Sequence, residues 1–324
     1  MDTTAITRAR RAFLGMSHSP LLGLNPVPAD DQQALDAAIA AARAAVHAFD
    51  PDLVVLIGPD HYNGFFNALM PPLCLGTAVH AVGDYLSPAG PLNVPEDLAL
   101  ALATHLMDAH VDIAVSRRME VDHGFAQALQ VLWGDELART PPVLPLFLNA
   151  VAPPAIARLA RCRTLGEALG RFLDGLPQRT LLIGSGGLSH EPPVPTLDHP
   201  DPAVRERITV GVPPTEAEKA AKTERVKAAG LALARGEAWM KPLNPAWDLD
   251  WMQALASGEL DRLCRHSEAC IETQAGRSAH ESKTWLVARA ALPQHPGLPC
   301  PVNAYRPVPS LIAGYGVMFM HTDD

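Results

Sequence analysis

Four histidines occupy the same kind of position in the sequence. His18, His61, His123 and His190 each follow a candidate β-strand by two to seven residues, in turn-forming sequence beside Gly, Pro or Asp. In an open α/β sheet, such positions gather at the carboxyl edge of the strands, where ligands bind. A single histidine in a loop is more often structural, and the chain has 13 histidines. Four of them at matching positions nevertheless favour a functional cluster.

A histidine cluster of this kind suits two kinds of chemistry. Neutral imidazole binds iron, zinc and other first-row ions, and it also accepts and donates protons near neutral pH. Two imidazoles and one carboxylate on one face of an Fe(II) ion leave coordination positions open for substrate and dioxygen. Glu281 is a candidate carboxylate because it follows His280 in the first turn of an expected helix. The helix dipole alone also favours Glu at such a position.

Other catalytic motifs are incomplete in this chain. The segment 280–284 begins like a zinc-protease helix but lacks the second histidine at Thr284, and no P-loop sequence occurs. The glycine-rich segment 184–189 lacks the third glycine of a dinucleotide-binding loop. Ser185 has Ile183, not glycine, two residues before it, so the nucleophile-elbow pattern is broken. We interpret these glycines as room for a tight turn that places His190.

Short apolar runs alternate with helical patterns over the first two thirds of the chain. Strands are predicted for residues 12–16, 53–57, 112–116, 143–148 and 180–183, and Pro145 favours an edge or early-strand position for the fourth run. Helices are predicted over 30–49, 94–110, 124–137 and about 164–176. The last of these helices is expected to open at a capping box formed by Thr164 and Glu167. The alternation predicts an α/β layered sheet that is largely parallel.

The last third of the chain has a different character. Helical patterns dominate residues 216–292, in stretches 216–235, 250–272 with a break near Gly258, and 280–292. The apolar run 312–320 then predicts a final strand. Residues 1–10 are polar and are expected to form a mobile tail. The region 191–214 is rich in Pro and Asp and predicts a long surface loop or lid.

Composition limits the classes of partner and the compartment. The 324-residue chain is 48% hydrophobic and 19% charged, a globular balance, and its formal net charge of −9 comes without any Lys/Arg stripe. These features argue against nucleic acid as a partner. The absence of an apolar run of 18 residues argues against a membrane span, and the first residues do not read as an export signal. The five cysteines form no CxxC pair, so we expect reduced thiols and a cytoplasmic location.

Six segments together resemble one enzyme family, the class III extradiol ring-cleaving dioxygenases of the protocatechuate 4,5-dioxygenase β-subunit superfamily. They lie in order along nearly the whole chain after residue 11. The segments are 17–23 (SHSPLLG), 59–66 (PDHYNGFF), 121–127 (VDHGFAQ), 184–195 (GSGGLSHEPPVP), 243–247 (LNPAW) and 305–309 (YRPVP). The resemblance implies a single extradiol dioxygenase domain over 11–324, with a three-layer α/β/α fold around a central, largely parallel or mixed sheet. It also implies a homo-oligomer.

The same resemblance implies a set of site residues. In that superfamily Fe(2+) is held by a histidine after the first strand, a histidine after the next strand and a late helical glutamate, which fall here on His18, His61 and Glu281. His123 and His190 look like the family's acid and base. A catechol must lose a phenolic proton to bind iron through both oxygens, so His190 is expected to accept a proton. His123 is expected to donate one as the O–O bond breaks, and such assistance is typically worth 10²–10⁴-fold in rate.

The expected reaction is therefore the insertion of both atoms of O2 into a catechol ring beside the diol, in aromatic catabolism. The substrates that the resemblance suggests are 2,3-dihydroxyphenylpropionate and 2,3-dihydroxycinnamate, each of which would give a hydroxy-keto-diene dioate. Another catechol, such as a simple alkyl catechol, is an alternative. A basic residue should meet the acid side chain of the substrate, and the sequence does not rank the candidates Arg117, Arg118, Lys283, Arg289 and Arg306.

Two other functions stay open at this point. A zinc hydrolase could use the same two histidines and one carboxylate, and it would activate water without consuming oxygen. A non-catalytic member of the superfamily is the other alternative. Such a protein is expected to lack part of the five-residue set, whereas this chain has a residue of the right type at all five positions.

Overall fold

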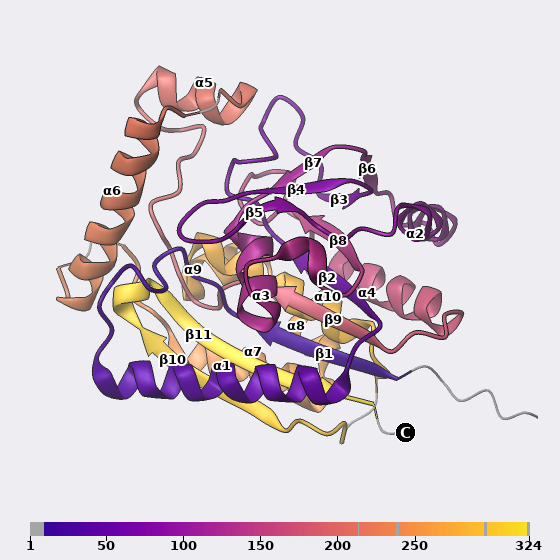
Figure 1. Cartoon of the computed structure of the whole chain (residues 1–324). Helices are drawn as coiled ribbons and strands as arrows, with labels where there is room; N and C mark the ends of the chain where they lie inside the picture. The colour runs from indigo at the N-terminus through magenta and orange to yellow at the C-terminus, as the bar shows by residue number, and fades with distance from the viewer. Residues whose placement is uncertain (1–9, 213, 238–239, 295–296, 323–324) are drawn as a thin grey trace, which may run out of the picture.

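A mixed eight-stranded sheet forms the centre of the computed structural model, which describes residues 10–212, 214–237, 240–294 and 297–322 (Figure 1). The order across the sheet is β10-β11-β1-β9-β2-β8-β3-β6. The strands β1, β9, β2 and β8 are parallel neighbours, whereas β11 is antiparallel to β1 and β3 is antiparallel to β8. The bounds are β1 Arg11–Met16, β2 Leu53–Gly58, β3 Leu73–Gly76, β6 Ala114–Ser116, β8 Val143–Leu148, β9 Thr180–Ser185, β10 Val302–Val308 and β11 Ala313–His321.

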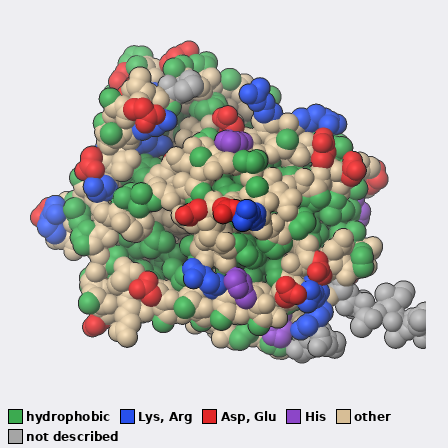
Figure 2. Space-filling view, in the orientation of Figure 1, with side chains coloured by type: hydrophobic (Ala, Val, Ile, Leu, Met, Phe, Trp, Pro, Cys, Tyr) green, Lys and Arg blue, Asp and Glu red, His purple; other side chains and the backbone are tan. Residues whose placement is uncertain are grey.

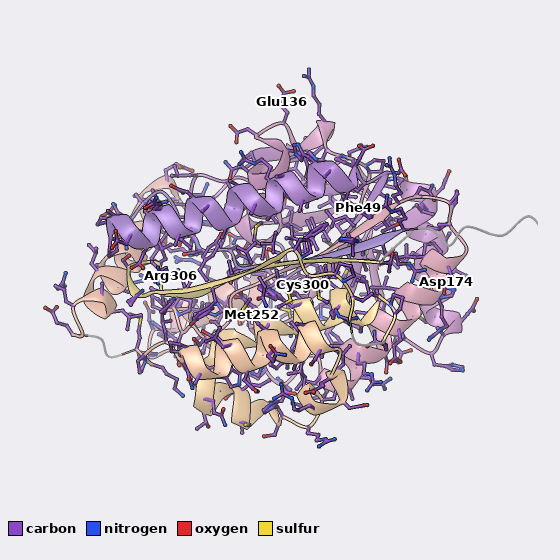
Figure 3. The ribbon with its side chains drawn as sticks, turned by 90° about the horizontal axis from the view of Figure 1, so that it is seen from below. Phe49, Glu136, Asp174, Met252, Cys300 and Arg306 are labelled. Carbon is purple, nitrogen blue, oxygen red and sulfur yellow. The ribbon has the colours of Figure 1, made fainter. Side chains whose placement is uncertain are left out.

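Helices cover both faces of this sheet, which confirms the predicted three-layer α/β/α fold. Successive side chains of a strand point to opposite faces, so Leu56 packs in one hydrophobic cluster and Ile57 in the other. One face is covered by α1 (Ala29–Phe49) and α3 (His123–Trp133). The other face is covered by α2 (Glu96–Asp108), α4 (Leu159–Asp174), α7 (Pro245–Ser257) and α10 (Ser282–Ala290). Figure 3 shows α1, which ends at Phe49, and α7, which carries Met252, on opposite sides of the sheet.

Smaller elements surround the end of the sheet where the loops converge. A second, three-stranded sheet has the order β5-β4-β7, and α5 and α6 lie together at one side of the molecule (Figure 1). The bounds are β4 Val79–Val82, β5 Ala89–Pro91, β7 Met119–Val121, α5 Pro202–Val210, α6 Glu216–Ala234, α8 Leu260–Leu263 and α9 Glu268–Ala275, with short 3₁₀ turns at η1 Leu137–Arg139, η2 Arg277–Glu281 and η3 Pro309–Leu311.

Two local predictions are wrong. The helix expected to open at Thr164 begins at Leu159, so Thr164 lies inside α4, where its hydroxyl donates to the Ala160 carbonyl. A threonine can make this bond to the preceding turn, so the capping-box spacing was not diagnostic. Pro145 lies in an interior strand, β8, and not at an edge. Pairing with β3 begins only at Leu146, so the proline lies just outside that ladder.

For the later part of the chain, several predictions made from the sequence are confirmed by the structure. The predicted helix 216–235 is α6, and a capping box between Thr215 and Glu218 begins it. The break expected near Gly258 is present, because α7 ends there with Gly258 in a left-handed conformation. The predicted final strand is β11. Nine of the ten residues of the predicted mobile tail, 1–9, lie outside the described residues.

The molecular surface and the cysteines bear on the expected partners and compartment. On the face in Figure 2, basic and acidic side chains are interspersed, without the broad cationic area that a nucleic-acid surface needs. No helix in the described part of the chain has the length and apolar character needed to cross a membrane. All five cysteines are free thiols.

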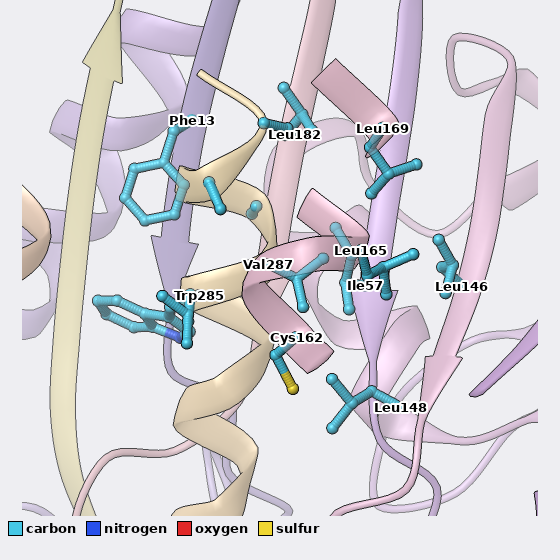
Figure 4. Packing of buried hydrophobic residues seen from close by; sticks show 14 of the residues in the cluster. Phe13, Ile57, Leu146, Leu148, Cys162, Leu165, Leu169, Leu182, Trp285 and Val287 are labelled. Carbon is cyan, nitrogen blue, oxygen red and sulfur yellow. The ribbon is translucent and has the colours of Figure 1, made fainter. Parts of the chain in front are cut away.

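Helix α10 packs against the sheet, and Figure 4 shows its Trp285 and Val287 among the buried hydrophobic side chains. Glycines of the sheet face this helix. A Cβ at Gly184 of β9 would lie 2.6 Å from the Cα of Trp285, and one at Gly15 of β1 would lie 2.3 Å from the Trp285 ring. Trp285 is fully buried and its indole N–H donates to the Gly186 carbonyl. The residue before α10 is Glu281, so this close contact determines how far that carboxylate extends toward the ends of the strands.

We predict that Gly184→Ala lowers the free energy of unfolding by about 1–3 kcal/mol, because the added methyl meets backbone atoms of Trp285 that cannot move without displacing α10. Chemical denaturation measures the change. Gly175→Ala is the matched control, since the nearest atom to its Cβ is the Phe172 carbonyl oxygen at 3.5 Å. Equal stability of the two variants would contradict the assignment of this close contact.

Candidate metal centre and catalytic pocket

The structure brings all five predicted site residues together at one edge of the sheet. His18 follows β1, His61 follows β2 and His190 follows β9. Because these strands are parallel and adjacent, their carboxyl ends meet at the same edge. His123 is the first residue of α3. Glu281 is the last residue of η2, directly before α10, and not in the first turn of one continuous helix as expected.

Glu281 lies at the centre of the cluster. Its side chain is 1% exposed, and its Oε2 is 3.3 Å from the Nε2 of His18. Its Oε1 is 3.2 Å from the Nε2 of both His61 and His190. The Gly187 N–H donates to Oε2 at 2.9 Å. Burial disfavours the carboxylate form, but the surrounding imidazoles, His190 first, lower the pKa of Glu281 well below its ordinary value. Among the described residues, the centre therefore holds a buried anion whose ion-pair partners are imidazoles.

His18 has the properties of a metal ligand. Its Nδ1 lies 3.0 Å from the hydroxyl of Ser185, at the end of β9. Its Nε2 is buried and has no hydrogen-bond partner in the described part of the chain, although it faces Glu281. Burial lowers the pKa of His18 to about 3, so the imidazole is neutral. An unpartnered lone pair on a neutral, buried imidazole is what a first-row ion binds.

His61 is oriented by an aspartate behind it. Its Nδ1 is 3.0 Å from Oδ2 of Asp122, and its backbone N–H donates to the same oxygen at 2.8 Å. A carboxylate on Nδ1 fixes the tautomer and leaves Nε2 to face Glu281, as in many metal-binding histidines. Burial opposes protonation of His61, but Asp122 and Glu281 outweigh it and raise its pKa well above the ordinary value. The site thus favours a positive charge between His61 and Glu281, which a metal ion would supply.

The residues present fit a divalent first-row ion, and they offer two ligand sets. The first consists of His18, His61 and Glu281, two imidazole nitrogens and one carboxylate oxygen, which suits Fe(II) or Zn(II). The second replaces Glu281 by His123, since ligand atoms of His18, His61 and His123 all lie within 4.8 Å of one another. We favour the first set. Among the described residues, the ion-pair partners of the buried Glu281 carboxylate are histidines and not Lys or Arg, and such a buried anion needs a cation.

His123 is held by a second aspartate. Its Nδ1 is 2.7 Å from Oδ2 of Asp84, and its backbone N–H donates to Oδ1 of the same residue at 2.8 Å. Its ring stacks on His61 with the centroids 4.7 Å apart. Because Asp84 only accepts, Nδ1 carries a proton and Nε2 is the nitrogen free for chemistry.

His190 sits on a loop that a buried polar network fixes. Its Nδ1 lies 2.9 Å from the Leu188 carbonyl. The preceding residue, Ser189, donates its N–H and hydroxyl to Asp248 at 2.7 and 2.6 Å, and the Tyr305 hydroxyl also donates to Asp248 at 2.6 Å. Burial raises the pKa of Asp248 against these bonds. The Asn244 N–H donates to the Ser189 hydroxyl at 2.8 Å. The segments 243–247 and 305–309, which the resemblance used, therefore both take part in the network that holds this loop.

Sequence reasoning missed these supporting carboxylates. Asp122 gave a signal, since it directly precedes His123 in the VDHG segment and its side chain caps α3 by accepting from the Gly124 N–H. Asp84 gave none, because it lies far from His123 in the chain and in unremarkable sequence. Asp248 directly follows the segment 243–247 that carried the resemblance, but that segment gave no sign of a contact with the loop of His190. Their partners are defined only by the fold.

The five residues line one side of a cavity of about 1120 Å³. The prediction of a loop over 191–214 is wrong in part, because α5 occupies Pro202–Val210, and residue 213 lies outside the described residues. Residues from the rest of this segment line the cavity together with residues of α5 and α6. Its wall is largely apolar and includes Leu21, Val194 and Ile312. A flat aromatic ring can therefore lie beside the imidazoles with much of its surface out of water.

None of the five basic residues proposed for the substrate carboxylate lines this cavity. Lys283 and Arg289 are fully buried elsewhere, and Arg117 pairs with Glu96 at the surface. Arg118 is exposed, and Arg306 faces Asp31 at 3.6 Å. The basic residues that do line the cavity are Arg207, Lys219, Lys222, Arg225 and Arg277. Residue type alone could not select them, because their position depends on how α6 and the neighbouring loops fold over the site.

Comparison with known proteins places this geometry in context. Residues 12–316 match a family described as the catalytic LigB subunit of aromatic ring-opening dioxygenase. A Comamonas testosteroni protein named 2,3-dihydroxyphenylpropionate/2,3-dihydroxicinnamic acid 1,2-dioxygenase is 75% identical, over 99% of this chain and 100% of its own length. Proteins with the same name from Mycobacterium sp. (strain MCS) and Mycolicibacterium vanbaalenii are 49% and 48% identical, over 95% and 96% of this chain and 98% of each relative.

We predict that His18→Ala, His61→Ala and Glu281→Ala each weaken binding of a divalent ion, by more than the roughly 10–100-fold that loss of an outer hydrogen-bonding partner costs. Anaerobic titration with Fe(II) measures the affinity. His123→Ala should keep tight binding of the ion if the first ligand set is correct, so this variant distinguishes the two ligand sets. If His123→Ala lost the ion while Glu281→Ala kept it, the second set would be the correct one.

Proposed function

Because the chain belongs to the LigB family of aromatic ring-opening dioxygenases, we propose that it cleaves 2,3-dihydroxyphenylpropionate or 2,3-dihydroxycinnamate beside the diol. Both oxygen atoms of O2 enter the product, a hydroxy-keto-diene dioate of aromatic catabolism. The observation that supports this substrate most strongly is the 75% identity, over almost the full length, to a relative that carries both compounds in its name.

Family membership confirms the resemblance on which the sequence analysis relied, to extradiol ring-cleaving dioxygenases. It also decides between the functions left open there. A zinc hydrolase does not belong to a ring-opening dioxygenase family, and a non-catalytic relative would not be expected to bring together all five site residues.

We propose Fe(2+) as the metal, held by His18, His61 and Glu281. When bound, a ferrous ion supplies a Lewis acid for the catechol oxygens and the electron density that dioxygen requires. In this ligand set one carboxylate offsets half of the charge of a divalent ion, so the centre keeps a small net positive charge. This remaining positive charge attracts an anionic, chelating substrate. Zinc fits the same donors but has no second oxidation state in proteins.

His190 is the proposed proton acceptor. Its Nδ1 faces a carbonyl oxygen, which only accepts, so in the neutral ring Nδ1 carries the proton and Nε2 has the free lone pair. That Nε2 faces the Glu281 carboxylate, and burial, which works against protonation, is outweighed by Glu281, so the pKa of His190 rises. A proton taken from a phenolic oxygen is therefore stabilised on His190.

His123 is the proposed proton donor. Its Nδ1 is committed to Asp84, so the proton available for transfer lies on Nε2 of the imidazolium. The Asp84 carboxylate stabilises that cation and holds the ring stacked beside His61. From this position His123 delivers its proton to the oxygen on which negative charge develops as the O–O bond breaks.

We also propose that the protein is a cytoplasmic homo-oligomer. The cytoplasmic location is supported by the five free thiols, which a reducing compartment maintains. The oligomer rests on the family alone, and analytical ultracentrifugation of the purified protein tests it.

The proposed reaction makes a clear prediction about the metal. Protein reconstituted anaerobically with Fe(II) should consume O2 and form a yellow ring-fission product when 2,3-dihydroxyphenylpropionate and air are added, at one O2 for each substrate. The same protein loaded with Zn(II) should consume none. Oxygen uptake with zinc, or a colourless product with iron, would contradict the proposed chemistry.

The proposed proton transfers predict a different pattern for the other two histidines. His123→Ala and His190→Ala should retain iron but lose about 10²–10⁴-fold in turnover, since each loses acid or base assistance. Iron content and kcat are measured on the same samples. His80→Ala, which removes an exposed histidine outside the cavity, is the control. Full turnover of both variants would remove these residues from the mechanism.

A further inference from the structure

Helix α6 carries two basic residues, Lys222 and Arg225, that form no ion pair with an acidic residue in the described part of the chain. Its other two, Lys219 and Lys227, lie 2.7 Å from Glu216 and Glu224. The remaining glutamate of the helix, Glu218, pairs with Arg207. Every glutamate of α6 is therefore already engaged by another cation. Within the described ranges, no ion pair or hydrogen bond is made by the side chain of Lys222 or Arg225, although both line the cavity.

Both residues line the cavity from α6, and of the two Lys222 is half-buried whereas Arg225 is exposed. Val226 and Ala229 of the same helix are buried, and Lys222 is one turn before Val226, on the same face. The Lys222 ammonium is 5.9 Å from the centre of the Tyr85 ring. The Tyr85 ring in turn meets His123 edge-on, with the centroids 5.3 Å apart. A continuous set of contacts thus leads from the proposed proton donor, His123, through Tyr85 to Lys222.

The other cations around the cavity are not free to bind an anion. Arg207 pairs with Glu218, and Arg277 pairs with Glu191 at 3.0 Å. The chain as a whole carries a net charge of −9, which repels an anionic substrate at long range. A local pair of unpaired cations is therefore the feature that can attract and orient such a substrate.

We propose that Lys222 and Arg225 bind the carboxylate of the substrate's three-carbon acid side chain, while the catechol ring lies beside the imidazoles in the cavity that Tyr85 also lines. This inference rests on the proposed function, because it assumes an acid-bearing catechol. It explains why α6 lies along the cavity with its glutamates neutralised. It also gives the enzyme a means to distinguish acid-bearing catechols from alkyl catechols, which offer no group to these two cations.

The test compares two substrates of the same length. Wild-type enzyme is assayed with 2,3-dihydroxyphenylpropionate and with 3-propylcatechol, which lacks the carboxylate. In Lys222→Gln and Arg225→Gln, KM for the acid should rise about fivefold to tenfold and by more in the double variant, with kcat little changed, since loss of 1.4 kcal/mol of binding is tenfold in affinity. KM for 3-propylcatechol should not rise.

Binding without turnover provides an independent readout. Calorimetric titration with 3-phenylpropionate in the absence of O2 should show weaker binding in both variants and in high salt, which screens the charges. Arg225→Lys, which keeps the charge, should lose less than Arg225→Gln. Lys227→Gln is the matched control, because it removes the same charge from the same helix at a residue that is already paired.

The outcomes separate this inference from the proposed function. If the wild type cleaves neither catechol, the proposed function is wrong. If it cleaves the acid and the two variants bind and turn over the acid as the wild type does, the carboxylate site is wrong and the function stands. An equal rise in KM for both substrates would also overturn the inference, because it would reflect a change in the shape of the cavity and not the loss of a charge contact.

Discussion

One carboxylate surrounded by three imidazoles is the constraint on which the rest of the structure depends. Glu281 is buried, and its oxygens lie 3.2–3.3 Å from the Nε2 atoms of His18, His61 and His190. An anion so far from water is stable only beside positive charge. The protein therefore has to bring three separate strand ends to one point, and it leaves there a place suited to a divalent ion.

The architecture meets this constraint by close packing beneath the site. The strands that carry His18, His61 and His190 are parallel neighbours, so their ends meet without further adjustment. The glutamate comes from the opposite direction, at the start of α10, and reaches them because Gly15 and Gly184 allow Trp285 to lie directly against the sheet. A small change in this packing would move the carboxylate and leave the imidazoles in place. The stability of the core and the geometry of the site are thus coupled through one helix.

A second layer of carboxylates holds three of the four histidines in place. Asp122 and Asp84 each accept from both the ring and the backbone N–H of one histidine, His61 and His123. Asp248 acts one residue away from His190, through Ser189 and Tyr305. In His61, His123 and His190 alike, an acceptor faces Nδ1, which keeps the proton there and leaves Nε2 for the site. The different roles proposed for these imidazoles therefore depend on where each Nε2 lies. On the wall of the cavity, α6 adds cations that are placed to bind the substrate and not the metal.

The sequence by itself determined the α/β alternation, the histidines His18, His61, His123 and His190, and the family, because strand ends and turn motifs are local patterns. It also placed α6 and the break at Gly258 correctly. It failed at Thr164 and Pro145, where a helix and an interior strand tolerate residues that more often mark an end. The tertiary structure alone decided that Asp84 and Asp248 support the histidines and that the cations on the cavity wall come from α6 and its neighbours. These contacts join residues distant in the chain, and their strength comes from burial, a property that exists only once the chain has folded.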